Sequence, residues 1–150
     1  MKTLPSFSDR LAALLMAGTP AVLVTVGGDG WGHAAMTWAA ADDPQRVRFG
    51  VDHGSATLAN LERDGRAALQ IIGTDNILAL IKGRARVRRA RIAAAPFPMA
   101  LWEIAVTEVK DQSWGPVVVA PLAYEWIGPE AATLRRIEQA VLAELRDWSG

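Results

Sequence analysis

Cysteine is absent from this chain of 150 residues, which excludes disulfides, thiolate catalysis and metal sites ligated by cysteine. Apolar runs of the ~18 residues that a membrane helix needs are also missing. The first apolar run is short and follows Asp9 and Arg10, which is not the pattern of a secretory signal. We therefore expect a cytoplasmic protein with no membrane partner.

Net charge is lacking too, because sixteen basic residues balance sixteen acidic ones. This balance gives no overall attraction toward nucleic acid, so we expect no nucleic-acid partner. Hydrophobic residues make up 51% of the chain, and they include six tryptophans but one tyrosine. Tryptophans often line ligand pockets or subunit contacts. The length favours a single domain over residues 1–150.

Hydrophobic periodicity predicts a strand-rich chain with three helices. We expect helices over residues 6–17 and 58–64 and from Gly128 onward, and strands over 21–26, 31–40, 46–51, 66–73, 77–91, 100–109, 117–119 and 123–127. Residues 27–30 form a hairpin turn. Residues 77–91 alternate between an apolar face at odd positions and a face that becomes basic from Lys82 onward. Strands interrupted by single helices favour a small barrel plugged by helices.

Four segments resemble one family in their order and spacing. They are DGWGHAAMTWAA at 29–40, SATLANLERDGRAAL at 55–69, LIKGRARV at 80–87 and WEIAVTEVKD at 102–111. Together they resemble the pyridoxamine-5′-phosphate-oxidase-like family of FMN-binding split β-barrels. The resemblance implies a mainly β fold, a six-stranded split barrel of Greek-key type, with N-terminal, inserted and C-terminal helices. It also implies a homodimer that holds FMN in a cleft at the subunit interface.

The chain departs from the family pattern at three places. A lysine that often contacts the cofactor phosphate falls at Thr57, and a usual proline falls at Gly65. The strand that carries paired arginine and glutamine contacts in the true oxidases reads Ile77-Leu78-Ala79-Leu80 here. These differences argue against an authentic pyridoxamine phosphate oxidase.

Ser55 and Thr57 stand where the chain turns from a strand into a helix. Two hydroxyls and the free N–H groups of a helix start can accept a phosphate without a lysine. A serine at this position is also an ordinary helix N-cap, which satisfies one N–H group. The residues alone favour the cap and the resemblance favours a phosphate site, so both interpretations stay open.

The predicted cofactor-binding residues come from several parts of the chain. By resemblance, the second strand runs beside the flavin, and the turn before the inserted helix holds the phosphate. Lys82 or Arg84 could replace the missing lysine, unless the basic strand face is simply solvated. The full set is Met36, Thr37, Trp38, Val51, Asp52, His53, Ser55, Thr57, Asn60, Lys82, Arg84 and Trp114.

Metal ligands and a catalytic triad are not evident. His33 and His53 have no acidic residue at metal-ligand spacing, so we expect no metal site. No Ser-His-Asp arrangement stands out, and no catalytic residue is assigned. Trp38, Trp114 and Trp126 could pack near a flavin ring, or they could fill the core or a subunit contact.

These expectations together indicate a flavin-binding protein, an FMN-dependent oxidoreductase that acts on a small molecule. The lack of a clear general acid or base is consistent with hydride transfer at flavin N5, since the cofactor supplies the chemistry. Three alternatives stay open. One is a deazaflavin-dependent reductase, and another is a non-enzymatic module that binds a flavin, or haem through a histidine. The third is an empty barrel that serves as a structural dimer.

Overall fold

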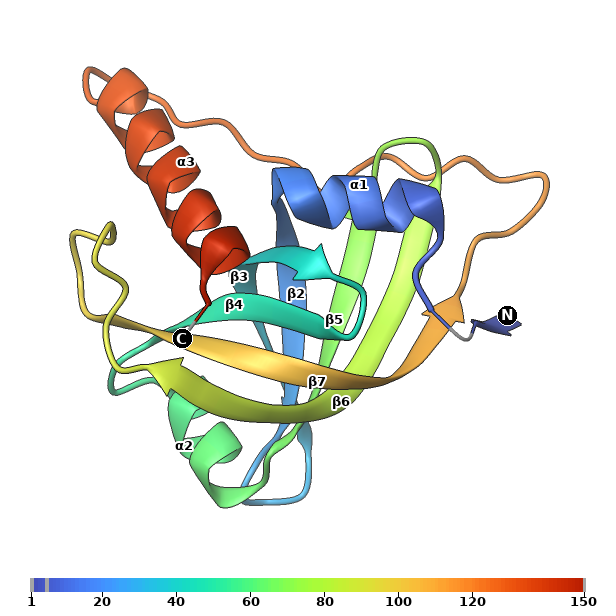
Figure 1. The fold of residues 1–150 in the computed structure, drawn as a ribbon, viewed down its shortest axis with the longest axis horizontal. Helices are drawn as coiled ribbons and strands as arrows, with labels where there is room; N and C mark the ends of the chain where they lie inside the picture. The colour runs from blue at the N-terminus through green and yellow to red at the C-terminus, as the bar shows by residue number, and fades with distance from the viewer. Residues whose placement is uncertain (1, 5, 150) are drawn as a thin grey trace.

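The computed structural model describes residues 2–4 and 6–149, and within them the chain forms seven strands and three helices (Figure 1). In chain order these are β1 (Lys2–Leu4), α1 (Asp9–Ala17), β2 (Thr19–Val26), β3 (Gly32–Asp43), β4 (Arg46–Asp52), α2 (Ala56–Arg63), β5 (Arg66–Gly73), β6 (Ile77–Arg89), β7 (Met99–Asp111) and α3 (Ala131–Asp147).

Six of the strands close into an antiparallel barrel. Hydrogen bonds link the strands in the order β7, β4, β3, β2, β5 and β6, and β6 pairs with β7 to complete the ring. The short β1 pairs with the end of β7. This arrangement confirms the predicted mainly β fold, a six-stranded split barrel with N-terminal, inserted and C-terminal helices.

The main core fills the barrel interior. Alternate residues of β2 and β5 are buried, as expected for strands with one face inward. Leu11 and Leu15 of α1 join this core, and Leu61 of α2 joins it too. The two helices lie at opposite ends of the barrel in Figure 1.

A second, smaller core lies under α3. Val141 and Leu145 of this helix pack with Ala40, Ile92 and Leu101. The helix expected from Gly128 onward is therefore attached to the barrel by one apolar face. Within the described residues, no helix is both long and apolar enough to cross a membrane.

A buried arginine ties the end of α3 to the barrel wall. The Arg48 Nε donates to Glu103 Oε2 at 3.1 Å, and Arg48 Nη1 donates to Asp42 Oδ1 at 3.0 Å. The same Nη1 donates to the carbonyl of Arg146 at 2.8 Å. The last carbonyls of a helix have no intrahelical donor, so Arg48 supplies one and fixes the position of α3.

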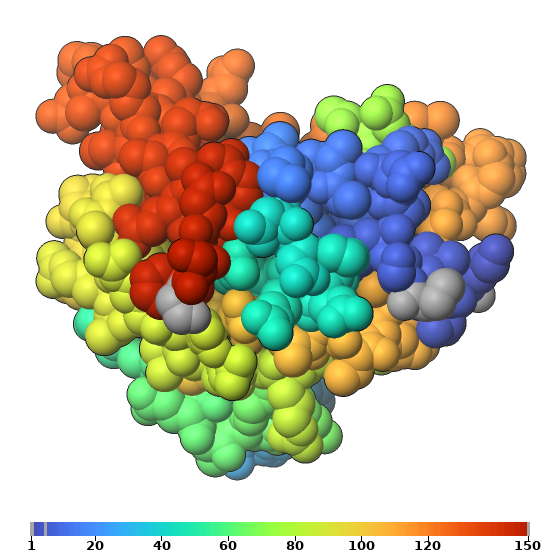
Figure 2. All heavy atoms as spheres, viewed as in Figure 1, coloured from blue at the N-terminus to red at the C-terminus, as the bar shows by residue number. Residues whose placement is uncertain are grey.

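Glu144 of α3 holds the segment between β6 and β7. Its carboxylate accepts hydrogen bonds from the N–H groups of Ala93 and Ala94 at 2.9 and 3.0 Å. It also lies 3.5 Å from the Arg89 guanidinium. Figure 2 shows residues 90–98 lying against α3 on the molecular surface.

The two predicted strands at 117–119 and 123–127 are wrong, because this part of the chain is irregular. Pro121 lacks the N–H that a strand ladder needs. The side chain of Asn76 takes the place of a neighbouring strand. Its amide donates to the carbonyl of Val117 at 3.0 Å and accepts from the N–H of Val119 at 2.8 Å.

The predicted ends of the other elements differ by a few residues. α1 begins at Asp9 instead of residue 6, and its N-cap is Ser8, since the Ser8 hydroxyl accepts from the Leu11 N–H. α2 begins at Ala56, two residues before the predicted start. β1 was not predicted, because three residues carry no periodicity that distinguishes a strand.

β6 keeps its predicted alternation only over its first half. Ile77, Ala79 and Ile81 are buried, but the register with β7 then shifts between Lys82 and Gly83. A side chain at Gly83 would collide with the backbone of β7. Beyond this shift Ala85 still packs against the main core, but Val87 and Arg89 are exposed, so the buried face of the strand ends there.

Candidate functional site

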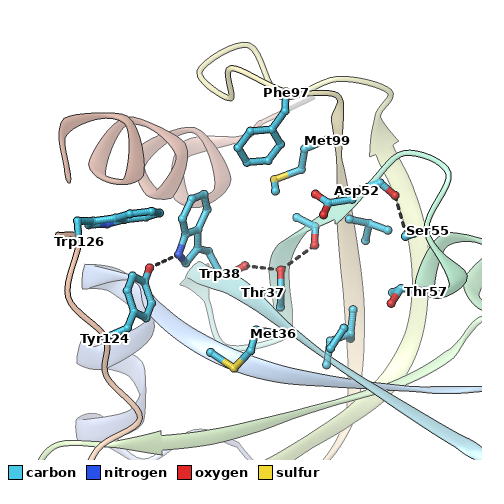
Figure 3. A pocket seen from close by; sticks show the side chains of 14 residues that line it. Met36, Thr37, Trp38, Asp52, Ser55, Thr57, Phe97, Met99, Tyr124 and Trp126 are labelled. Atoms are coloured by element: carbon cyan, nitrogen blue, oxygen red, sulfur yellow. Dashed lines mark hydrogen bonds between the residues drawn. The ribbon is translucent and has the colours of Figure 1, made fainter. Parts of the chain in front are cut away.

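A cavity of about 470 Å³ lies beside the barrel wall (Figure 3). Such a volume is in the usual range for small-molecule sites. Its walls come from β2, β3, β4, the start of α2, the first residue of β7 with the segment before it, and the segment before α3. The lining residues are Leu23, Ala35, Met36, Thr37, Trp38, Gly50, Val51, Asp52, Ser55, Thr57, Phe97, Met99, Tyr124 and Trp126.

The cavity opens where β3 and β4 separate. The two strands pair at Ala39 with Phe49, but the earlier part of β3 pairs only with β2, and the later part of β4 pairs only with β7. The Thr37 hydroxyl spans the divergence by donating to the Gly50 carbonyl at 2.7 Å. A side chain at Gly50 would collide with Met99, so glycine lets Met99 pack closely at the cavity wall.

The start of α2 forms one end of the cavity, which we call the helix end, defined by Asp52, Ser55 and Thr57. The Ser55 hydroxyl accepts from the Leu58 N–H at 3.1 Å and donates to the Asp52 carbonyl at 2.7 Å. Ser55 is therefore the N-cap of α2. Thr57 is 6% exposed, and among the described residues its hydroxyl has no hydrogen-bond partner.

The other end, which we call the aromatic end, consists of Trp38, Tyr124 and Trp126 with Glu138 behind them. The rings of Trp38 and Trp126 meet edge to face at 6.5 Å between centroids, and those of Tyr124 and Trp126 do so at 5.6 Å. The Trp38 indole N–H donates to the Tyr124 hydroxyl, which donates to Glu138. Trp126 Nε1 donates to Glu138 Oε2 at 3.1 Å.

Glu138 is the ionisable group most affected by this arrangement. It lies half-buried on α3, and burial raises the pKa of its carboxyl above the ordinary value. The cause is desolvation, which disfavours the charged form. No Lys, Arg or His nitrogen of the described residues lies within 4.0 Å of the carboxylate, which is hydrogen-bonded only by neutral donors.

Seven of the predicted site residues lie together along the cavity. They are Met36, Thr37, Trp38, Val51, Asp52, Ser55 and Thr57. The other five do not line it. Asn60 is buried and donates to the Thr25 hydroxyl at 3.0 Å, which joins α2 to β2. His53 lies 2.7 Å from the Ala90 carbonyl through Nε2.

The predicted basic residues are also away from the cavity. Lys82 lies 3.5 Å from Glu108 on the neighbouring strand, and Arg84 is exposed two residues further along the same strand. Trp114 is 71% exposed in the loop after β7. Within the described residues, the lining contains no lysine, arginine or histidine, and Asp52 is its single carboxylate.

Some lining residues were not in the predicted set. They are Leu23, Ala35, Gly50, Phe97, Met99, Tyr124 and Trp126. Trp126 and Tyr124 come from the irregular segment that the sequence indicated as strands. The one available signal for Tyr124 was its rarity, since it is the single tyrosine of the chain.

Comparison with known proteins agrees with this architecture. Residues 7–127 match the family model described as pyridoxamine 5′-phosphate oxidase. The chain belongs to this family. Compared by sequence, no curated protein matches the chain.

Solved structures show the same fold at low sequence identity. HupZ of Group A Streptococcus is 15% identical with a TM-score of 0.61, and the match covers 73% of this chain and 96% of HupZ. A proposed pyridoxamine 5′-phosphate oxidase of Lactobacillus delbrueckii is 19% identical with a TM-score of 0.60, covering 73% and 99%. An F420 reductase is 17% identical with a TM-score of 0.58, covering 71% and 100%.

Proposed function

We propose that this family member binds a flavin in the cavity and uses it to oxidise or reduce a small molecule. The observation that carries this proposal is the position of the cavity, between a wall of apolar and aromatic side chains and the start of a helix. A planar ring system needs apolar walls, and an anionic tail needs N–H donors. The cavity offers both, at its two ends.

The residues present fit FMN in a defined way. Met36, Trp38 and Phe97 would pack on the ring system, and the N–H groups at the start of α2, with the Thr57 hydroxyl, would hold the phosphate. A bound flavin would supply hydride transfer, and the protein would supply binding, orientation and exclusion of water. The Ser55 hydroxyl already has two partners, so its part is to fix the helix start.

No lysine, arginine or histidine among residues 2–4 and 6–149 lines the proposed phosphate site. Lys82 and Arg84 do not line the cavity, and Asp52 adds negative charge near the helix end. We infer that the helix start carries the phosphate interaction, at an affinity of tens of micromolar, about −6 kcal/mol. FMN would then exchange rather than stay permanently bound.

We do not propose that the protein oxidises pyridoxamine phosphate, the substrate of the true oxidases. Residues 77–80 carry no arginine or glutamine, and Ile77 and Ala79 are buried in the barrel core. A deazaflavin analogue in place of FMN is the second candidate, since the fold is shared with an F420 reductase. The visible absorption maximum separates the two, because it lies at shorter wavelength for a deazaflavin, and the mass of the extracted chromophore confirms it.

We also propose that the chain is a homodimer. Met36 at the cavity is 56% exposed, and Val118 in the irregular segment is 83% exposed. Exposed apolar side chains indicate an interface where they form one contiguous patch, and we propose that these side chains do so. Sedimentation at several protein concentrations tests this; a monomer throughout would contradict it.

The test of the phosphate site compares FMN with riboflavin, which has the same ring system but no phosphate. In Thr57→Val the side chain keeps its shape and loses its hydroxyl. We expect FMN affinity to fall about tenfold, since the lost hydrogen bond goes to a charged group, while riboflavin affinity is unchanged. Lys82→Ala is the control and should change neither affinity.

Two outcomes would contradict the proposed function. If FMN and deazaflavin both fail to bind at tens of micromolar, the cavity is not a flavin site. If Lys82→Ala weakens FMN and Thr57→Val does not, the phosphate lies elsewhere. If the protein binds a flavin but neither NAD(P)H nor any small electron donor reduces it, the protein is better described as a non-enzymatic flavin carrier.

A further inference from the structure

Among the described residues, the carboxylate of Glu138 differs from those of the other glutamates that are shielded from solvent. Glu103, Glu108 and Glu144 each lie within 4.0 Å of a lysine or arginine nitrogen. Of the residues that the structure describes, only the neutral donors of Tyr124 and Trp126 hydrogen-bond to Glu138. A half-buried charge without a counter-ion is unfavourable, so this site gains free energy if a cation comes near it.

The cavity is where such a cation can approach. Tyr124 and Trp126 line the cavity and both donate to Glu138, so the carboxylate lies at the polar edge of both rings. Figure 3 shows these two rings and Trp38 gathered at one side of the cavity, opposite Ser55 and Thr57. Faces of tryptophan and tyrosine attract organic cations, and more so when the site is partly desolvated.

We propose that the aromatic end binds a small organic cation, an amine or quaternary ammonium group. Its charge would lie against the rings of Trp38, Tyr124 and Trp126 and be stabilised through them by Glu138. The lining agrees with this sign of charge, because within the described residues it holds Asp52 and no cationic side chain. That such a cation is the substrate of a flavin reaction rests on the proposed function. That the cavity binds it as a ligand does not.

The experiment uses two probes of one shape, choline and its neutral carbon analogue 3,3-dimethylbutan-1-ol, added to the flavin-free protein. The indole N–H signals of Trp38 and Trp126, assigned by single Trp→Phe variants, report binding in an NMR titration. We expect choline to shift both signals and to bind about tenfold more tightly than the alcohol. Equal affinity for the two probes, or unshifted indole signals, would overturn the proposal.

Glu138→Gln removes the charge and keeps the size and one acceptor oxygen. We expect it to weaken choline binding about fivefold, because it removes a negative charge that attracts the cation, and to leave the alcohol unchanged. Glu125→Gln is the matched control, since Glu125 is exposed between Tyr124 and Trp126 in sequence and should have less than a twofold effect. If the two variants weaken choline equally, or if Glu138→Gln weakens both probes alike, the carboxylate does not act as proposed.

These measurements separate the inference from the proposed function. If the protein binds choline more tightly than the alcohol but binds no flavin, the cation site is supported and the proposed flavin reaction is contradicted. Flavin binding with no preference between the two probes would do the reverse.

Discussion

The two ends of the cavity are built in different ways. The helix end is local: Asp52, Ser55 and Thr57 lie within six residues of one another, and the cap of α2 sets their positions. The aromatic end joins distant parts of the chain, since Trp38 and Tyr124 are 86 residues apart and Glu138 comes from a separate helix. The helix end should therefore depend on one cap, whereas the aromatic end should depend on contacts far from the cavity.

The strongest test of this difference is Arg48→Met. Arg48 fixes α3, and its loss leaves Glu103 buried without its closest cation. We expect a loss of about 3–5 kcal/mol in the free energy of unfolding, the usual cost of removing one partner of a buried pair. Urea denaturation measures it. The choline-dependent indole shifts should become smaller, because α3 is held less firmly. The variant should still bind FMN more tightly than riboflavin.

Arg86→Met is the control for this variant. Arg86 lies 3.9 Å from the same Glu103 but is largely exposed, and exposed pairs contribute about 0–1 kcal/mol. A loss as large as that of Arg48→Met would show that the stability comes from total charge and not from the buried network.

A second test acts on the irregular segment that carries Tyr124 and Trp126. Asn76→Ala removes two hydrogen bonds to that segment and places alanine at a positive φ of 58°. We expect a loss of about 2 kcal/mol, and choline binding should weaken although the substitution does not touch the cavity.

Asp75→Ala serves as the comparison, because Asp75 has a φ of 57° as well. It should carry only the backbone cost, about 1 kcal/mol, and leave choline binding unchanged. If the two variants have the same effect on choline binding, the segment is not positioned by the Asn76 side chain.

The helix end is tested by Ser55→Ala. Loss of the N-cap should cost about 1 kcal/mol of stability and lower FMN affinity several-fold, with no change in choline binding. Ser8→Ala removes the cap of α1, whose hydroxyl accepts from Leu11, at a similar cost in stability. Since α1 does not line the cavity, Ser8→Ala should leave FMN affinity as it is; a parallel loss in both variants would attribute the effect to stability alone.

The difference between local and long-range contacts also explains which parts of the structure the sequence could predict. The six barrel strands and all three helices follow from periodicity and turn residues. The segment before α2 was predicted as a site because the residues that cap the helix are close together in the sequence. Tyr124 and Phe97 were missed, because nothing near them in the sequence shows that their segments fold back over β3 and β4. Lys82 and Arg84 were placed at the phosphate by charge alone, and the register of β6 puts them away from the cavity.

The smallest expected effect concerns the pH dependence of stability. Burial raises the pKa of Glu138 above its ordinary value of 4.5, so the folded protein retains a proton that the unfolded chain has already released. This contribution stabilises the fold fully below the unfolded pKa and is lost as the pH rises through the folded pKa. The stability of the unmodified protein relative to Glu138→Gln should therefore fall as the pH rises from 4.5.

The contribution of Asp111 to stability should change with pH in the opposite direction. Hydrogen bonds from the Ser113 hydroxyl and N–H hold the pKa of Asp111 below its ordinary value of 3.8. Its contribution is present above the unfolded pKa and is lost as the pH falls through the folded one. Relative to Asp111→Asn, the unmodified protein should gain stability as the pH rises toward 3.8. Urea denaturation at intervals of pH measures both differences, and equal signs in the two variants would show that Glu138 is not destabilised by burial.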